Sequence, residues 1–188
     1  MINVAVFCGS ARDVDERYMR HAFQVGHIVA SRGHALICGG GSRGMTKHLV
    51  DGFLGVASSA DAVSVVSAEL AHQSDNVDAR RKTVVHESLG ARKEAMLKMS
   101  ELAVVLPGGL GTLDELVHLL AMRSIKNRVP SVVVCDYWGD FAGLFDYFHK
   151  LVERKFAREE LFQCDVVQSD DELIDRLATF ELRQSVSR

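Results

Sequence analysis

Short runs of consecutive apolar residues alternate along this chain with longer segments whose apolar positions recur every three or four residues. The run Leu102–Leu106 is short, rich in β-branched residues and uncharged, a composition that favours a buried strand. From Leu113 onward the apolar spacing becomes that of a helix with one buried face. The same alternation predicts further strands within 3–8, 35–38, 62–66, 83–86, 129–134 and 162–167, and helices within 15–31, 45–56, 88–99, 113–122, 142–155 and 170–180.

The predicted strands are apolar throughout, unlike those of a sheet with one solvated face. Such strands, separated by helices, form a parallel sheet covered by helices on both faces. With 188 residues, 47% of them hydrophobic, the chain can bury a sizeable core. We therefore predict an α/β fold, a single Rossmann-like domain over residues 1–183, and a frayed C-terminal tail over 184–188.

Three predicted strands end in glycine-rich turns, at 9–10, 39–44 and 108–111. In sheets of this kind ligands bind beyond the carboxyl ends of the strands. The turn from Gly108 to Thr112 leads into a helix, so its backbone N–H groups favour an anion, typically a phosphate. Thr112 is expected to cap that helix, and Glu115 lies about one turn after Gly111. A turn that merely joins strand to helix is the simpler reading; the recurring glycines favour phosphate.

Composition and charge exclude several classes of protein. The 22 basic and 25 acidic residues leave a net charge of −3, which argues against general binding of nucleic acid. No apolar run reaches the length of a membrane span, and the chain begins with a strand-like run, so we expect a cytoplasmic protein. The four cysteines are far apart and are expected to be free thiols, with a catalytic role left open for Cys8.

Several motifs of other enzymes are missing. The segment Gly9-Ser10-Ala11-Arg12 lacks the dinucleotide-binding fingerprint, and the second predicted strand ends in glycine rather than an acidic residue. The sequence contains no Walker-type Gly-Lys-Ser/Thr and no cluster with metal-ligand spacing. The basic run Arg80-Arg81-Lys82 is expected in a solvated loop.

Two motifs at a characteristic distance carry a resemblance. Pro107–Glu115 matches Pro-Gly-Gly-x-Gly-Thr-x-x-Glu, and Arg92-Lys93-x-x-Met96 matches a second signature upstream. Together they resemble the Lonely Guy family of cytokinin riboside 5'-monophosphate phosphoribohydrolases, many of which were first labelled lysine decarboxylases. The resemblance implies hydrolysis of the N-glycosidic bond of a nucleoside 5'-monophosphate, AMP or a cytokinin riboside monophosphate, with Arg92 and Glu115 as the catalytic pair.

The chemistry of these residues fits that activity, because a carboxylate stabilises an oxocarbenium-like transition state and orients water. The resemblance implies a homodimer and no metal or organic cofactor. The net charge and the lack of a long apolar run predict neither nucleic acid nor membrane as partner. The substrate-binding positions implied by the motifs and the glycine-rich turns are Ser10, Gly40, Gly41, Glu69, Arg92, Lys93, Gly108, Gly109, Leu110, Gly111, Thr112, Leu113 and Asp114.

The chain departs from the family at the end of the site expected to face the base. Ser88-Leu89-Gly90 stands where most plant-like members have Asp-Met-His, and the loop 70–82 is longer than usual. We therefore expect a base preference that differs from a cytokinin, with AMP as the simplest substrate. The alternative is a non-catalytic nucleotide or phospho-sugar binding protein of the same fold. Amino-acid decarboxylation is disfavoured because it needs an electron sink such as pyridoxal phosphate.

Overall fold

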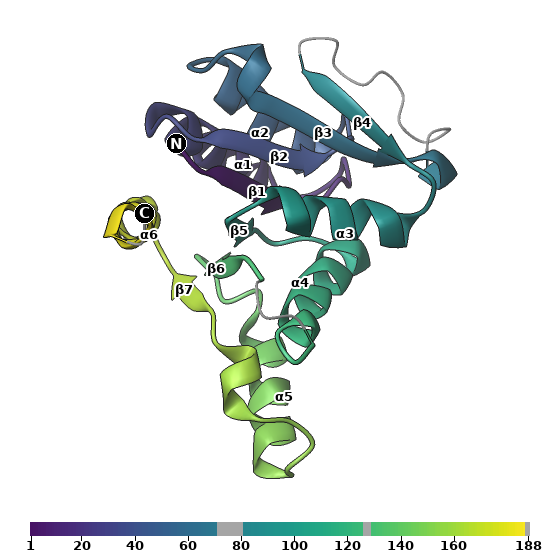
Figure 1. Cartoon of the computed structure of the whole chain (residues 1–188), viewed down its shortest axis with the longest axis vertical. Coiled ribbons are helices and arrows are strands. Elements are labelled where there is room, and N and C mark those ends of the chain that lie inside the picture. Colours follow the sequence, from purple (N-terminus) through teal and green to yellow (C-terminus); the bar gives the residue numbers. More distant parts are fainter. Residues whose placement is uncertain (71–80, 126–128, 187–188) are drawn as a thin grey trace.

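The computed structural model describes residues 1–70, 81–125 and 129–186 (Figure 1). Its centre is one seven-stranded sheet in the order β4-β3-β2-β1-β5-β6-β7, with every neighbouring pair parallel. The strands are β1 (Asn3–Phe7), β2 (Ala35–Gly39), β3 (Ala62–Ser67), β4 (Lys82–His86), β5 (Leu102–Val105), β6 (Ser131–Cys135) and β7 (Asp165–Val167). The helices are α1 (Glu16–Ser31), α2 (Gly44–Leu54), α3 (Leu89–Met99), α4 (Leu110–Met122), α5 (Ala142–Glu153) and α6 (Asp170–Val186), with short 3-10 turns at Ser59–Asp61, Ala68–Leu70 and Glu159–Phe162.

Helices cover both faces of the sheet, as the continuous apolar strands predicted. Successive residues of β1 point to opposite faces, so Val4 and Val6 join one core and Ala5 and Phe7 the other. Buried residues of α1, α2 and α6 complete the first core, and those of α3, α4 and α5 complete the second. Figure 1 shows α3 and α4 in front of the sheet and α1 and α2 behind it. The predicted α/β class and the parallel sheet are confirmed.

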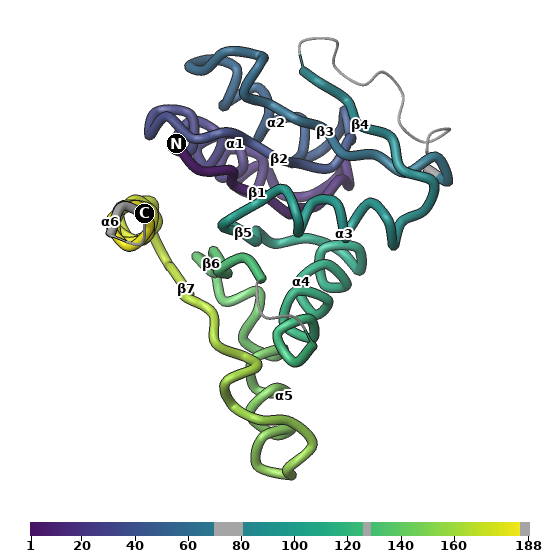
Figure 2. The backbone as a smooth tube through the Cα atoms, viewed as in Figure 1, coloured from purple at the N-terminus to yellow at the C-terminus, as the bar shows by residue number. Residues whose placement is uncertain are grey.

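The chain reverses its direction of travel across the sheet at β1. It fills the positions from β1 outward to β4, then crosses over to β5 on the other side of β1 and continues to β7. The tube in Figure 2 shows this division, with the purple-to-teal half on one side and the green-to-yellow half on the other. After β1 the chain continues to one side of the sheet, and after β5 it continues to the other side. Open α/β sheets bind their ligands at such a switch point, beyond the carboxyl ends of the two strands.

Most predicted boundaries lie within two residues of the observed ones, and the differences have local causes. Asp15 precedes α1 as its N-cap rather than forming its first residue, since its carboxylate accepts a hydrogen bond of 2.9 Å from the Arg17 N–H. The strand predicted over 162–167 is shorter, because Phe162 lies in a 3-10 turn and stacks on Phe148 with ring centroids 4.6 Å apart. The final helix continues to Val186, into the segment expected as a tail.

Within the described residues, no helix combines the length and the apolar character that crossing a membrane requires.

Candidate active site

Three loops at the carboxyl edge of the sheet enclose a cavity of about 550 Å³. They follow β1, β2 and β5, which are the strands that the sequence predicted to end in glycine. The first and third loops touch through their main chains: the Gly9 N–H donates to the Pro107 carbonyl at 3.3 Å. A Cβ on Gly9 would lie 3.3 Å from the Gly108 Cα, and one on Gly108 would lie 2.9 Å from the Gly9 N. Glycine at both positions therefore permits the close approach of the two loops.

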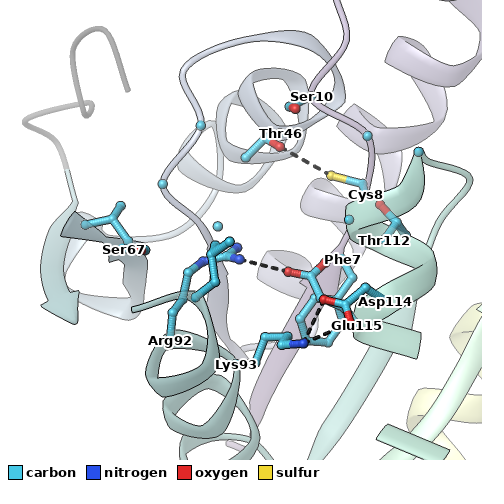
Figure 3. A pocket seen from close by; sticks show the side chains of 18 of the residues that line it. Phe7, Cys8, Ser10, Thr46, Ser67, Arg92, Lys93, Thr112, Asp114 and Glu115 are labelled. Atoms are coloured by element: carbon cyan, nitrogen blue, oxygen red, sulfur yellow. Dashed lines mark hydrogen bonds and ion pairs between the residues drawn. The ribbon is translucent and has the colours of Figure 1, made fainter. Parts of the chain in front are cut away.

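The cavity contains the N-terminus of α4 (Figure 3). Gly109 is the N-cap residue, and no side chain caps the helix. The prediction that Thr112 caps it is wrong, because the helix begins at Leu110 and places Thr112 within its first turn. The first intrahelical bond runs from the Leu113 N–H to the Gly109 carbonyl at 3.1 Å. The N–H groups of Leu110, Gly111 and Thr112 thus have no intrahelical acceptor and make a ready anion site.

Arg92 and Glu115 meet inside the cavity from two different helices. Figure 3 shows the Arg92 side chain reaching from α3 and the Glu115 side chain from α4. The Arg92 Nη1 donates to the Glu115 Oε1 at 3.1 Å, and the Arg92 Nε donates to the Val65 carbonyl at 2.9 Å. Their side chains are 16% and 10% exposed. Since a guanidinium has five N–H donors, three are left to face a ligand among the described residues.

The environment of Glu115 makes its carboxylate more basic than usual. Burial is the larger effect and raises its pKa, because a low-dielectric site disfavours the charged form. The Arg92 charge and hydrogen bond oppose that rise but leave the pKa above its ordinary value. A carboxylate of this kind is suited to take a proton from a bound water.

A second ion pair runs parallel to the first between α3 and α4. The Lys93 Nζ donates to both carboxylate oxygens of Asp114, at 2.9 and 2.7 Å. Lys93 is mostly buried with its side chain 17% exposed, whereas Asp114 is 60% exposed at the rim. The sequence thus places four charged groups, two from each helix, on one side of the cavity.

The structure brings most of the predicted site residues together and leaves three outside the cavity lining. Gly108 lies beneath the loop as a packing residue, and Leu113 packs against the core on the α4 face. Glu69 accepts a hydrogen bond of 2.8 Å from the Leu89 N–H, at the start of α3, where a carboxylate stabilises the helix end. The predicted residues that line the cavity are Ser10, Gly40, Gly41, Arg92, Lys93, Gly109, Leu110, Gly111, Thr112, Asp114 and Glu115.

Several lining residues were not singled out as site residues from the sequence. Thr46 belongs to the first turn of α2, Ser67 ends β3, and Leu89 begins α3. The position of Ser67 at the carboxyl end of a parallel strand was the available signal. Cys8 lines the cavity beside the Thr46 Oγ1, at 3.7 Å, and burial raises the pKa of its thiol to about 12. Its protonated thiol is a poor nucleophile at neutral pH.

The expectation of a solvated basic run is wrong for Arg81, which is only 6% exposed. Its Nη2 donates to the Gly41 carbonyl at 3.1 Å, and its Nη1 lies 3.5 Å from the Cys38 Sγ. The reason is that β4 begins at the next residue, which turns Arg81 beneath the loop after β2. Arg80 lies outside the described residues. Across the described ranges, no group of histidine, cysteine and acidic side chains is arranged to hold a metal ion.

Comparisons with known proteins show which family the chain belongs to. A family model described as "possible lysine decarboxylase" matches residues 47–177. The chain is 31% identical over 181 residues to a cytokinin riboside 5'-monophosphate phosphoribohydrolase of Mycobacterium marinum, covering 93% of this chain and 92% of the relative. A protein of the same name from Mycobacterium tuberculosis is 30% identical over 174 residues, covering 88% of this chain and 89% of the relative.

Solved structures of other proteins have the same fold as this chain. The molybdenum cofactor carrier protein of Chlamydomonas reinhardtii superposes with a TM-score of 0.72 over 96% of this chain and 98% of that one. At 18% identity this similarity shows the fold alone. The family model and the near full-length relatives go further: this chain belongs to the "possible lysine decarboxylase" family, which includes the cytokinin riboside 5'-monophosphate phosphoribohydrolases and is the Lonely Guy family indicated by its motifs.

Proposed function

We propose that this protein hydrolyses the N-glycosidic bond of a nucleoside 5'-monophosphate, releasing a free base and ribose 5-phosphate. The observation that carries the proposal is a buried Arg92–Glu115 pair in a cavity that also contains the uncapped N-terminus of α4. The names of the mycobacterial relatives support the same activity.

The 5'-phosphate would bind at the start of α4. The N–H groups of Leu110, Gly111 and Thr112 supply donors, and the positive end of the helix dipole favours the phosphate charge. This binding is remote from the bond that breaks, so its energy can be used to hold the ribose in the reactive position.

Glu115 would act at the other end of the ribose. As the C1'–N bond breaks, its electron pair leaves with the base and positive charge develops at C1', which a nearby carboxylate stabilises. Water attacks C1' and forms the new C–O bond, and Glu115 takes the proton that water loses. The raised pKa of Glu115 strengthens it as a base, and this proton can then pass to the leaving base.

Arg92 would hold both the carboxylate and the substrate. Only two of its donors have partners in the described structure, so three remain for ribose hydroxyls or a phosphate oxygen. A site that only bound nucleotides would not need a buried carboxylate next to this cation, because desolvating it costs stability.

We infer AMP as the first substrate to test, with cytokinin riboside monophosphates beside it. The segment that differs from plant-like members is at the edge of the cavity: Ser88 caps α3 through its side chain, and Leu89 lines the cavity. An apolar, neutral Leu89 favours contact with a base that offers a flat apolar face. We also propose that the protein is cytoplasmic and forms a homodimer. Sedimentation of the purified protein would measure its oligomeric state.

Base release is the direct test. The purified protein is incubated with AMP, GMP, CMP, UMP and isopentenyladenosine monophosphate, and the free base is followed by chromatography, with Glu115→Gln as the control. Release from at least one nucleotide that disappears in the variant is the expected result. No release from any of them, with AMP still binding, would identify a non-catalytic nucleotide-binding protein instead.

A further inference from the structure

The position of Arg92 depends on space that one backbone residue leaves empty. A Cβ built on Gly39 would lie 2.6 Å from the Arg92 Nη2 and 3.7 Å from its Cζ, and among the described residues beyond its chain neighbours it would approach no other group within 4 Å. The guanidinium therefore occupies the space that a side chain at Gly39 would fill.

The sheet explains why this space faces Arg92. Gly39 is the last residue of β2, and the period of two puts it on the same face as Ile37, the face that α3 covers. Its partner in register on β3 is Val65, whose carbonyl accepts the hydrogen bond from the Arg92 Nε. The ends of two neighbouring strands thus hold one guanidinium, the first by leaving space and the second by accepting a hydrogen bond.

The next glycine in the same turn has a different role. A Cβ on Gly40 would lie 1.7 Å from the Val66 Cγ1, which is a packing conflict with the sheet itself. A substitution at Gly40 therefore disturbs the fold, whereas one at Gly39 meets only the end of a long, flexible side chain.

We propose that Gly39 is a positioning residue for Arg92: its missing side chain allows the guanidinium to lie across the end of β2 and reach Glu115. The inference deepens the proposed function and rests on it for its effect on turnover. A methyl group at position 39 would push the guanidinium away from Glu115 while the fold persists.

The test compares Gly39→Ala, Arg92→Lys and the double variant Gly39→Ala/Arg92→Lys with the unmodified protein. The readout is the titration of the Glu115 carboxyl, followed by carbon NMR on protein labelled in glutamate. Arg92 lowers the pKa of Glu115, so moving it away should raise that pKa in Gly39→Ala. In the Arg92→Lys background, which lacks the clashing Nη2, Gly39→Ala should produce no further rise.

Turnover gives a second readout of the same displacement. Misplacing a catalytic group by about 1 Å can cost on the order of 10²-fold in rate, so Gly39→Ala should lower kcat by about that factor and shift the acid limb of the pH–rate profile upward. Gly143→Ala in α5 is the control, because its Cβ would meet nothing within 4 Å. That control should change neither the Glu115 titration nor turnover.

The outcomes separate this inference from the proposed function. An unchanged Glu115 titration in Gly39→Ala overturns the inference, whatever the activity. A raised pKa in a protein that releases no base supports the inference and rejects the hydrolase. If Gly39→Ala alone fails to fold, folding of the double variant supports the clash with Arg92, and failure of both overturns it.

Discussion

Replacing Glu115 with glutamine should abolish turnover without weakening the fold. The substitution keeps the shape of the side chain and an oxygen that can accept from the Arg92 Nη1, but it removes the negative charge. Loss of a general base lowers rates by roughly 10²–10⁴-fold, and the loss of charge stabilisation at C1' adds to this. Turnover should therefore fall by at least about 10²-fold.

The stability effect is the difference between two opposing contributions. Losing the charge-assisted part of the Arg92 hydrogen bond costs about 1 kcal/mol. Keeping a carboxylate that is 10% exposed out of water costs several kcal/mol, and the variant is relieved of that cost. Arg92 retains the Val65 carbonyl as an acceptor. Relief of desolvation outweighs the weakened hydrogen bond, so the variant should be at least as stable at pH 7.

The pH dependence follows from the direction of the Glu115 shift. Its folded pKa lies above the ordinary value of 4.5, so the charged form destabilises the folded state at pH values above that folded pKa. As the pH falls through the folded pKa, the carboxyl takes up a proton and this cost disappears. The advantage of Glu115→Gln should therefore be present at pH 7 and vanish below about pH 4.5.

Thermal unfolding at pH 7.5 and at pH 4, beside the base-release assay, measures both effects. For a chain of this size, 1 kcal/mol corresponds to about 2–4 °C in Tm. A Tm of Glu115→Gln more than about 4 °C below that of the unmodified protein at pH 7.5 would refute the reasoning. It would mean that attraction within the ion pair exceeds the cost of burying it.

Three further substitutions test other parts of the structure. Gly108→Ala places a Cβ 2.1 Å from the Thr112 Oγ1, so it should raise KM for the nucleotide and cost about 1–3 kcal/mol in thermal unfolding; unchanged KM contradicts a phosphate site there. Glu181→Ala removes hydrogen bonds of 2.8 Å to Arg32 and His34, so Tm should fall by about 4–8 °C for a loss of about 2 kcal/mol while base release persists. Arg81→Met keeps the volume of a buried side chain but not its donors, so KM should rise with little change in Tm; a fall in Tm with KM unchanged would make its role purely structural.

The fold was predictable because the central strands are apolar on both faces. Val4 and Ala5 point in opposite directions and both are fully buried, which a parallel sheet between two helical layers requires. The glycine-rich strand ends then predicted the edge of the sheet at which the site lies, because the carboxyl ends of parallel strands share one edge.

Side-chain directions within the site were less predictable. Leu113 was expected both on the buried face of its helix and among the substrate-binding residues, and these two roles conflict. Residues two apart on a helix point about 200° from one another, so Leu113 packs into the core while Glu115 lines the cavity. Arg81 was expected in solvent because neighbouring residues are polar, but the start of β4 turns it inward. Long-range placement of this kind depends on tertiary contacts that a local pattern does not contain.

The phosphate site that we propose at the start of α4 consists of main-chain N–H groups, while Leu110 within it is 85% exposed. Every residue except proline carries a backbone N–H, so other exchanges at such a position leave the donors intact. Ser67 and Leu89 line the cavity and carry larger side chains than the glycines of the loops, so an exchange at either position alters the groups that a bound base would contact. A gene duplicate of such a protein could thus diverge in the base it accepts while inheriting an unchanged means of holding the phosphate.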